Sequence, residues 1–352
     1  MDFQQTQESP KVLKETKNSI RVEFERTDAW TKFKLKYFSV NFLVTVIWAI
    51  FRFVLLLGIS YVILQPFFAK IASSFMSRED FVDVTVKLIP RYPTFDTYRA
   101  IIEDNHYFEA FFNTLTISLS SAIIQTFICA LIGYGFAKFK FKGSKLLFLL
   151  VVVTMLIPHK TLQLSMFMKF KHFDIFGIFN LLGGGVFERF RLIKFTSLDF
   201  CNSYWPLFLL SVFGLAFRNG LYIFMMRQFY RGVPDELEES AYIDGSGVMR
   251  TFFGIIIPLS IPMMMTIFLF SFSWQWTDNF YTNVFYTASG PKLMPDVVGI
   301  PRSLDTAYAG QNLYEAAIRN TCGLMILIPL IVVYCFGQKA LIQGIERSGI
   351  TG

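Results

Sequence analysis

Long apolar runs are the feature of this sequence that most limits its fold. A membrane-spanning helix needs about 20 consecutive apolar residues, and six stretches of the chain are close to that length or longer. They are 53–75, 112–137, 146–164, 205–226, 259–284 and 316–337. Hydrophobic residues make up 53% of the 352 residues and charged residues 17%, which is too apolar for an ordinary soluble domain. The sequence therefore predicts an all-α integral membrane protein with six transmembrane helices.

Residues 1–39 are polar and charged, unlike the spans that follow. They contain no early apolar core and no small-residue cleavage site, so we expect a cytoplasmic tail and not a secretory leader. Residues 40–50 are apolar but are followed by Arg52, which predicts an interfacial helix or a cytoplasmic extension of the first span. The transmembrane domain is thus expected to occupy 40–352.

Basic residues gather beside the predicted spans. Short loops rich in Lys and Arg mark the cytoplasmic side of a membrane protein, and Lys138, Lys140, Lys142 and Lys145 form such a cluster after the second span. We therefore attribute the net charge of +7 to membrane topology and expect no nucleic-acid partner. With six spans, both termini and the segment after the fourth span lie in the cytoplasm. The loop at 159–203 is also basic, although this topology places it on the extracytoplasmic side. Long loops follow the charge rule poorly.

The cysteines and histidines are not spaced for a metal or redox site. The 4 Cys lie far apart with no C-x-x-C pair, and the 3 His do not cluster. We expect buried thiols, histidines in loops or at the membrane interface, no metal and no cofactor bound by this chain.

The segment 231–258 contains a carboxylate cluster, an Asp-Gly break and a second apolar helix. Acidic residues near the first helix start suit the helix dipole, and Gly245 after Asp244 supplies a left-handed C-cap. Ser246 can then cap a second helix that ends at Pro258. The pattern predicts two short helices joined by a sharp elbow on the cytoplasmic face. The acidic residues favour a docking element over a connector lying on the membrane, because anionic lipid would repel them.

The stretch "EESAYIDGS", followed by "FFGIIIPLSIP", closely resembles the EAA loop of ATP-binding-cassette importer permeases, whose pattern is Glu-Ala-Ala, three residues, Gly, then Ile-x-Leu-Pro. The matching positions are Glu239, Ser240, Ala241, Gly245, Ile255, Ile257 and Pro258. Ser240 stands for the usual Ala and Ile257 for the usual Leu, with side chains of similar size. Other stretches, such as "ALIGYGFAKFKFKGSKLLFLL", "SWQWTDNF" and "FGQKALIQGIERSGITG", resemble the second permease of maltose and multiple-sugar type systems. The tail at 1–39 and the segment 179–202 depart from that pattern, and the latter is predicted to be an extracytoplasmic insertion.

The resemblance implies a six-span permease of the type I importer fold, acting as a subunit of an ATP-driven carbohydrate importer in a bacterial inner membrane. It implies a homologous second permease, a cytoplasmic ATPase dimer and an extracytoplasmic sugar-binding protein as partners. In that family the elbow sits in a groove of the ATPase. The residues that this implies for coupling are Glu238, Glu239, Ser240, Ala241, Asp244, Gly245 and Pro258. The sequence has no G-x-x-x-x-G-K-[ST] phosphate loop, so we expect a transport subunit and no enzyme, with ATP and Mg bound on the partner ATPase.

Polar residues inside the predicted spans are candidates for contact with cargo, because polar groups are costly in a membrane and usually face a cavity or a partner. The candidates are Arg218, Asn219, Trp274, Trp276, Asp278 and Asn279. The last four combine ring faces with hydrogen-bonding groups, a mixture that suits a sugar. The alternatives are that Arg218 extends to the outer interface and that the tryptophans belong to an aromatic belt.

Two other functions stay open on the residues alone. A gradient-driven secondary transporter or channel would carry midspan charges in several helices or broken helices in both halves, whereas Arg218 is the one midspan charge found. An importer permease for a non-sugar solute would share the elbow, since the elbow motif identifies the family and not the ligand.

Overall fold

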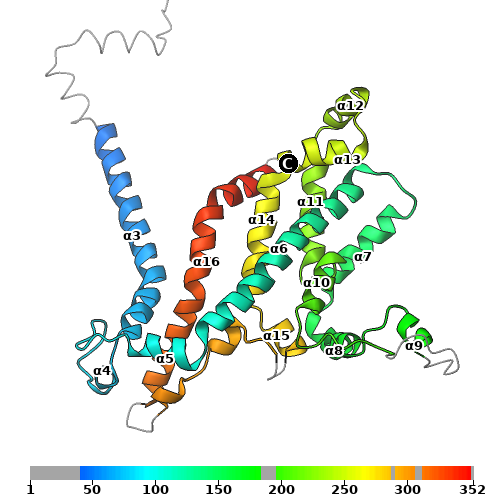
Figure 1. The fold of residues 1–352 in the computed structure, drawn as a ribbon. Helices are drawn as coiled ribbons and strands as arrows, with labels where there is room; N and C mark the ends of the chain where they lie inside the picture. The colour runs from blue at the N-terminus through cyan, green and yellow to red at the C-terminus, as the bar shows by residue number, and fades with distance from the viewer. Residues whose placement is uncertain (1–39, 184–195, 287–289, 306–310, 350–352) are drawn as a thin grey trace, which may run out of the picture. The chain divides into compact units, whose positions relative to one another are not determined.

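A computed structural model describes residues 40–183, 196–286, 290–305 and 311–349 (Figure 1). Over these ranges the chain forms helices and loops, and its β structure is one isolated bridge between Phe173 and Leu198. The chain divides into two compact units, Met1–Ala69 and Lys70–Gly352. The described part of the first unit belongs to α3 (Val40–Ser74), a single helix of 35 residues. Residues 40–50 are therefore a continuation of the first span, and the interfacial-helix alternative is wrong.

The second unit contains the remaining described helices. In chain order they are α4 (Arg78–Val82), α5 (Asp96–Asp104), α6 (Tyr107–Lys138), α7 (Ser144–Leu156), η1 (His159–Leu162), α8 (Gln163–Lys171), α9 (Ile178–Leu182), α10 (Trp205–Val212), α11 (Asn219–Arg231), α12 (Glu236–Ile243), α13 (Val248–Thr251), η3 (Phe252–Ile256), α14 (Ile257–Trp276), α15 (Phe280–Phe285), η4 (Met294–Val297), η5 (Arg302–Leu304) and α16 (Gln311–Gly349).

Four helical segments in the described chain are long and apolar enough to cross a membrane. They are Val44–Ser74, Tyr107–Lys138, Val248–Trp276 and Gln311–Gly344. Each contains one of the predicted spans or most of one: 53–75, 112–137, 259–284 and 316–337 respectively. A continuous helix suits such sequences because it satisfies every backbone N–H and C=O internally, and the bilayer core offers no other partner. The predicted span 259–284 extends too far toward the C-terminus, because α14 ends at Trp276 and α15 is a separate helix.

The predicted span 146–164 is bent in the structure. Helix α7 ends at Leu156, and the following helical segment, His159–Lys171, turns by 95°. Pro158 explains the break, because a proline disfavours helical backbone at the residue before it. Counting the bent pair as one crossing gives five candidate spans in the described chain.

The predicted span 205–226 is not a single helix. The structure has α10 and α11 separated by residues 213–218, where Gly214 and Arg218 have φ of 68° and 67°. The 8 residues of α10 and the 13 of α11 extend about 12 Å and about 20 Å at 1.5 Å per residue. Neither crosses a bilayer core of about 30 Å alone. Six continuous spanning helices are therefore not found among the described residues.

Helix α6 forms the centre of the second unit and packs against α10, α11 and α14. Its crossing with α11 depends on Gly133, since a Cβ at this position would lie 2.6 Å from the Cβ of Met226. Three buried apolar clusters surround α6 along its length. These contacts fix the positions of the polar residues that α6, α11 and α14 carry.

The segment 179–202, predicted as an insertion, is only partly described, because residues 184–195 lie outside the described ranges. Its base is closed by two backbone hydrogen bonds, from Phe173 N to Leu198 O at 2.8 Å and from Leu198 N to Phe173 O at 2.9 Å. Next to them, Lys171 Nζ donates to Asp199 Oδ2 at 2.6 Å. This hydrogen bond raises the pKa of Lys171 and lowers that of Asp199 from their ordinary values.

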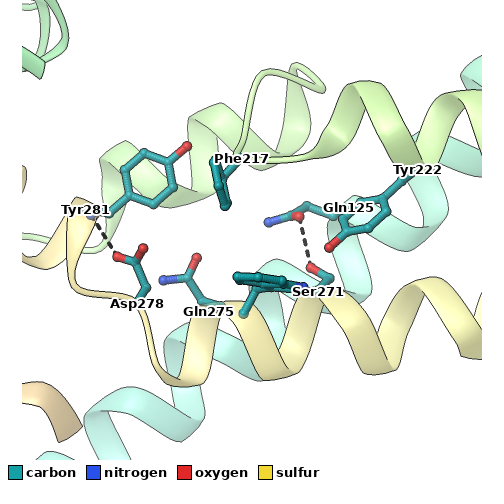
Figure 2. A pocket seen from close by; sticks show the side chains of 8 residues that line it. Gln125, Phe217, Tyr222, Ser271, Gln275, Asp278 and Tyr281 are labelled. Carbon is teal, nitrogen blue, oxygen red and sulfur yellow. Dashed lines mark hydrogen bonds between the residues drawn. The ribbon is translucent and has the colours of Figure 1, made fainter. Parts of the chain in front are cut away.

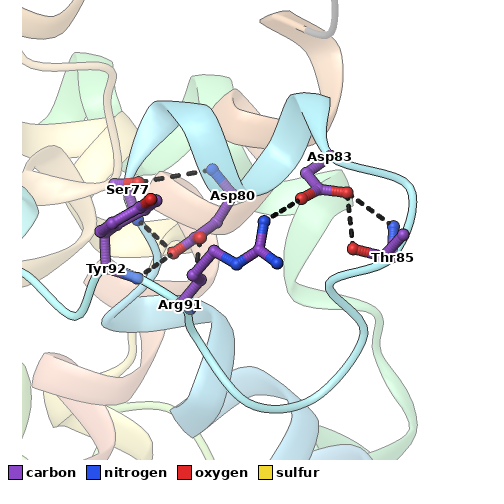
Figure 3. A network of polar contacts seen from close by, with 6 residues as sticks. All are labelled: Ser77, Asp80, Asp83, Thr85, Arg91 and Tyr92. Atoms are coloured by element: carbon purple, nitrogen blue, oxygen red, sulfur yellow. Dashed lines mark hydrogen bonds and ion pairs between the residues drawn. The ribbon is translucent and has the colours of Figure 1, made fainter.

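The loop after α3 is folded around the buried carboxylate of Asp80 (Figure 3). Its Oδ2 accepts the backbone N–H of Ser77 at 3.2 Å and of Tyr92 at 3.3 Å, and its Oδ1 accepts that of Arg91 at 3.2 Å. A peripheral ion pair joins Arg91 Nη1 to Asp83 Oδ2 at 2.9 Å. One carboxylate thus satisfies three backbone donors from the two ends of the loop.

We expect Asp80→Ala to release this loop, because three N–H groups lose their acceptor and each unsatisfied buried group costs about 1–3 kcal/mol. Trypsin cleavage at Lys87 in the purified protein should become faster by about tenfold or more. The matched control is Glu79→Ala, which removes an exposed carboxylate from the neighbouring position on α4. Equal cleavage rates for wild type and Asp80→Ala would contradict the role of Asp80.

Candidate functional site

Two short helices, α12 and α13, form the segment between α11 and α14, and we call them the elbow. The turn between them occurs at Gly245, whose φ of 81° is in the left-handed region. The N–H of Gly245 donates to Tyr242 O at 3.0 Å and that of Ser246 to Ala241 O at 2.9 Å, which satisfies carbonyls at the end of α12. The role of the elbow as a coupling element stays a prediction.

Two details of the predicted elbow are wrong. The residue that precedes α13 in extended conformation is Gly247, and Ser246 makes no cap. The second helix also does not end at Pro258, because α13 continues through the π-helical turn η3 into α14. Pro258 lies at the start of α14, where the wider π turn accommodates the missing N–H and the proline ring. The elbow is therefore continuous with α14.

A buried cation at the end of α6 holds the elbow in place. Lys138 Nζ donates to Val233 O at 2.6 Å and to Asp235 Oδ1 at 2.5 Å, and it lies 3.3 Å from Glu238 Oε1. Tyr134 OH donates to Glu238 Oε2 at 3.0 Å. We call Tyr134, Lys138, Asp235 and Glu238 the Lys138 cluster. The hydrogen bond from Lys138 also lowers the pKa of Asp235 below its usual range.

The predicted coupling residues divide between two faces of α12. Glu238 and Ala241 are 7% and 5% exposed and pack inward, so they attach the elbow to its own chain. Glu239, Ser240, Asp244 and Gly245 are exposed, as is Pro258 at the start of α14. Large apolar residues that the motif did not single out share the exposed surface: Leu237, Tyr242, Ile243, Val248 and Met249. Ile243 is the most exposed of these at 86%. Such a mixed apolar and acidic surface is typical of a protein-binding site.

A small polar cavity lies deeper in the second unit, among α6, α11, α14 and α15 (Figure 2). Its lining residues are Gln125, Phe217, Tyr222, Ser271, Trp274, Gln275, Asp278 and Tyr281. The Gln125 amide joins three helices, since Ser271 Oγ donates to its Oε1 at 2.9 Å and its Nε2 donates to Ser211 Oγ at 3.2 Å. The free volume is about 10 Å³, which is about the space one water needs. In this conformation the cavity is too small for a sugar.

Two of the predicted pathway residues, Trp274 and Asp278, line this cavity, and a third, Arg218, packs against Trp274. The Arg218 guanidinium carbon is 3.4 Å from the ring centroid of Trp274, which lines the cavity. Asp278 also lines it, and its Oδ2 accepts the N–H groups of Tyr281 at 2.7 Å and Thr282 at 3.3 Å, so that it caps α15.

The other three predicted pathway residues do not line the cavity. Trp276 is fully buried in the apolar core, where its Nε1 donates to Ile326 O at 3.0 Å. A side chain at this depth is not available for contact with cargo in this conformation. Asn219 is 1% exposed at the start of α11, and Asn279 is exposed before α15.

Sequence reasoning missed Gln125 and Lys138 as site residues. Gln125 is an uncharged amide in the apolar stretch 112–137, and such a group in a span points to a polar contact between helices. In the sequence, Lys138 stands out only as part of the basic cluster that marks the cytoplasmic side. Its burial depends on the fold of the elbow, which is 95 or more residues away in the sequence.

Comparisons with known proteins agree on one family. A family model described as "Binding-protein-dependent transport system inner membrane component" matches residues 129–347. The chain is 27% identical to a polygalacturonan/rhamnogalacturonan transport system permease protein of Bacillus subtilis, over 84% of this chain and 96% of that protein. It is 26% identical to a galactooligosaccharides transport system permease protein of the same organism, over 86% and 95% of the two chains.

One solved structure has a similar fold. It is the crystal structure of a bacterial ABC transporter involved in the import of the acidic polysaccharide alginate, matched with a TM-score of 0.61 and 18% identity. The match covers 84% of this chain and 96% of the other.

Proposed function

The chain belongs to the family of binding-protein-dependent transport system inner membrane components, and from this membership we propose that it is the permease subunit of an ATP-driven sugar importer. The chain is a transport subunit and not an enzyme. Sugar as cargo is supported by the relatives, whose names include transport systems for polygalacturonan, galactooligosaccharides and arabinooligosaccharides. A transporter driven by an ion gradient alone is not supported, because the family depends on a binding protein.

The elbow is the proposed contact with a cytoplasmic ATPase dimer, which would bind ATP and Mg. The observation that carries this proposal is the division of α12 into two faces. Glu238 is held by the Lys138 cluster, whereas Glu239 and Ile243 are exposed on the other side. One face of α12 is held against the rest of the chain and the other is exposed and partly apolar. Such a surface suits a groove on a partner, because the elbow loses little conformational freedom on binding.

The proposed topology has six crossings, with the fourth made jointly by α10 and α11. The helical parts of these two extend about 32 Å together, which matches a bilayer core of about 30 Å. The C-terminal part of α16 packs beside the start of α14, since a Cβ at Gly344 would lie 2.7 Å from Pro262 O. The elbow directly precedes α14, so a cytoplasmic elbow implies a cytoplasmic C-terminus. The basic residues near the first span support a cytoplasmic N-terminus in a bacterial inner membrane.

A homologous second permease and an extracytoplasmic sugar-binding protein complete the proposed assembly. The small size of the cavity around Gln125 is consistent with a path that opens between two permeases in another state. The tail at 1–39 and the segment 179–202 extend beyond the family pattern, and we propose that 179–202 contacts the binding protein or the second permease.

The test is reconstitution in proteoliposomes of the complex co-purified in mild detergent. Sugar uptake should need ATP, the ATPase and the binding protein, and Glu239→Lys should abolish uptake while the chain still inserts. The matched control is Glu236→Lys, which changes an exposed carboxylate at the start of α12, outside the EAA match. Sugar accumulation by the purified chain alone, or normal uptake by Glu239→Lys, would contradict the proposed function.

A further inference from the structure

Arg218 lies on the wall of a large cavity between two broken crossings. The cavity has a volume of about 580 Å³ and is lined by the bend after α7 and by the loop that joins α10 to α11. Phe217 lines both this cavity and the small polar one around Gln125, so the loop at 213–218 separates the two. The larger volume is in the range of sites that hold small organic ligands, which is about 300–1,000 Å³.

The positive charge of Arg218 has no counter-ion in the described part of the chain. Its guanidinium carbon lies 3.4 Å from the centroid of the Trp274 ring and 4.9 Å from that of Phe217. Among the described residues, no carboxylate oxygen lies within 4.0 Å of its nitrogen atoms, and its buried Nε has no hydrogen-bond partner. Asp278, which lines the adjoining cavity, accepts the N–H groups of Tyr281 and Thr282 with its Oδ2 and forms no ion pair with Arg218. Ring faces attract a cation but do not neutralise it.

The place of Arg218 in the chain makes this charge costly. It precedes α11, whose 13 residues place it about 20 Å from the elbow end of that helix, and thus at the depth of the bilayer. Charges at this depth almost always face a cavity and pair with another group. The N-terminus of α11 adds partial positive charge at the same place. The adjacent Asn219 is 1% exposed, and both polar atoms of its amide lack a partner.

The backbone of Arg218 is also held in an unusual conformation. Its φ of 67° is in the left-handed region, which costs of order 1–3 kcal/mol for a residue other than glycine. The stacking of the guanidinium on Trp274 and Phe217 holds the side chain beside the cavity before any ligand arrives. Such pre-organisation is typical of ligand-binding positions.

We propose that Arg218 pairs with a carboxylate of the cargo as the cargo passes, so that the substrate class is an oligosaccharide containing uronic acids. This rests on the proposed function as a sugar importer. A planar guanidinium matches the two oxygens of a carboxylate, and a cargo carboxylate supplies the missing counter-ion. A neutral sugar supplies hydroxyl groups but no charge, and leaves the cost of the unpaired cation in place.

The experiment measures ATP-dependent uptake of trigalacturonate and of galactotriose, which have the same length and differ in charge, by the reconstituted complex with its binding protein. Wild type should transport trigalacturonate in preference to galactotriose. Arg218→Gln should lower trigalacturonate uptake by about 10- to 100-fold, the value of a lost charged hydrogen-bonded contact, and galactotriose uptake by less than about twofold. Arg218→Lys keeps the charge and should retain part of the uronate uptake.

The matched control is Arg227→Gln. Arg227 lies within α11, the helix that Arg218 precedes, and its guanidinium also lies over a ring, 3.9 Å from the centroid of Phe148, but its Nε donates to Phe136 O. This change should affect the two sugars equally.

Three results would overturn this inference but leave the proposed function in place. They are an equal loss of uptake of both sugars in Arg218→Gln, no loss of uptake in that variant, and uptake of only the neutral sugar by wild type. Loss of the second permease from Arg218→Gln on size-exclusion chromatography would also overturn it, because the counter-ion would then belong to the partner. Failure of the wild-type complex to transport either sugar with ATP would overturn the proposed function as well.

Discussion

Gly245→Pro is expected to abolish sugar uptake while the chain remains in the membrane. Proline fixes φ near −65°, whereas Gly245 has a φ of 81°, and proline also removes the N–H that donates to Tyr242 O. No heavy atom lies within 4 Å of a Cβ built at this position, so the effect comes from the backbone and not from a clash. The elbow would be destabilised by about 3 kcal/mol or more, which lowers the population of its native form by about 100-fold.

The matched control for this change is Gly247→Pro. Gly247 is also in the elbow and also has open space around it, but its φ of −78° is in the range that proline adopts. Uptake by this variant should stay within about twofold of wild type. ATP-dependent uptake and membrane insertion are measured for both variants in the same preparation. If Gly245→Pro transports as well as Gly247→Pro, the sharp turn is not needed for coupling.

Lys138→Met is expected to cause the second large loss, by leaving Glu238 buried without its cation. The side chains of Lys138 and Glu238 are 8% and 9% exposed, and removing one partner of a buried pair costs about 3–5 kcal/mol. The contact to Asp235 is shorter, but that carboxylate is 79% exposed, so solvent weakens its contribution. The elbow should detach from α6, and uptake should fall by about 100-fold or more, with ATP hydrolysis no longer linked to transport.

A double variant separates the stability of the cluster from its function. Lys138→Met with Glu238→Met removes both charges, and such replacements are often neutral for stability. Thermal unfolding of the double variant should therefore be close to that of wild type, whereas the single variant unfolds at a lower temperature. Lys142→Met, at an exposed lysine in the next loop, is the control and should change neither property. An unfolding temperature in Lys138→Met equal to that of Lys142→Met would rule out the proposed role of the cluster.

The elbow could be predicted largely from local sequence rules. Its first helix ends where the Asp-Gly pair places the left-handed turn, because glycine is the residue that adopts this conformation without strain. The rules failed at Pro258, which was expected to end a helix. A π turn directly before it let the helix continue, and this turn depends on how Phe252 and Ile256 pack in the core.

The breaks within the predicted spans 146–164 and 205–226, and the inward face of the elbow, could not be predicted in the same way. Hydropathy averages over a window, so residues 213–218 look as apolar as a helix although Gly214 and Arg218 turn the chain there. Glu238 and Glu239 are neighbours in one acidic motif, and only the position of Lys138 shows that one is buried and the other exposed. Trp276 resembles Trp274 in the sequence, but a rotation of about 200° between them on the helix places one in the core.

The continuity of the elbow with α14 has a mechanical consequence. The elbow is fastened to α6 by Lys138 and runs into α14 without a break, and the same two helices are joined again where Ser271 donates to Gln125 at 2.9 Å. Gln125 is 13 positions from Lys138, which is about 20 Å along α6. Because α6 and α14 are connected both at the elbow and at Gln125, they cannot slide freely past each other when the elbow moves. A stroke at the cytoplasmic end would therefore also load the contact between Ser271 and Gln125, which lies beside the small polar cavity.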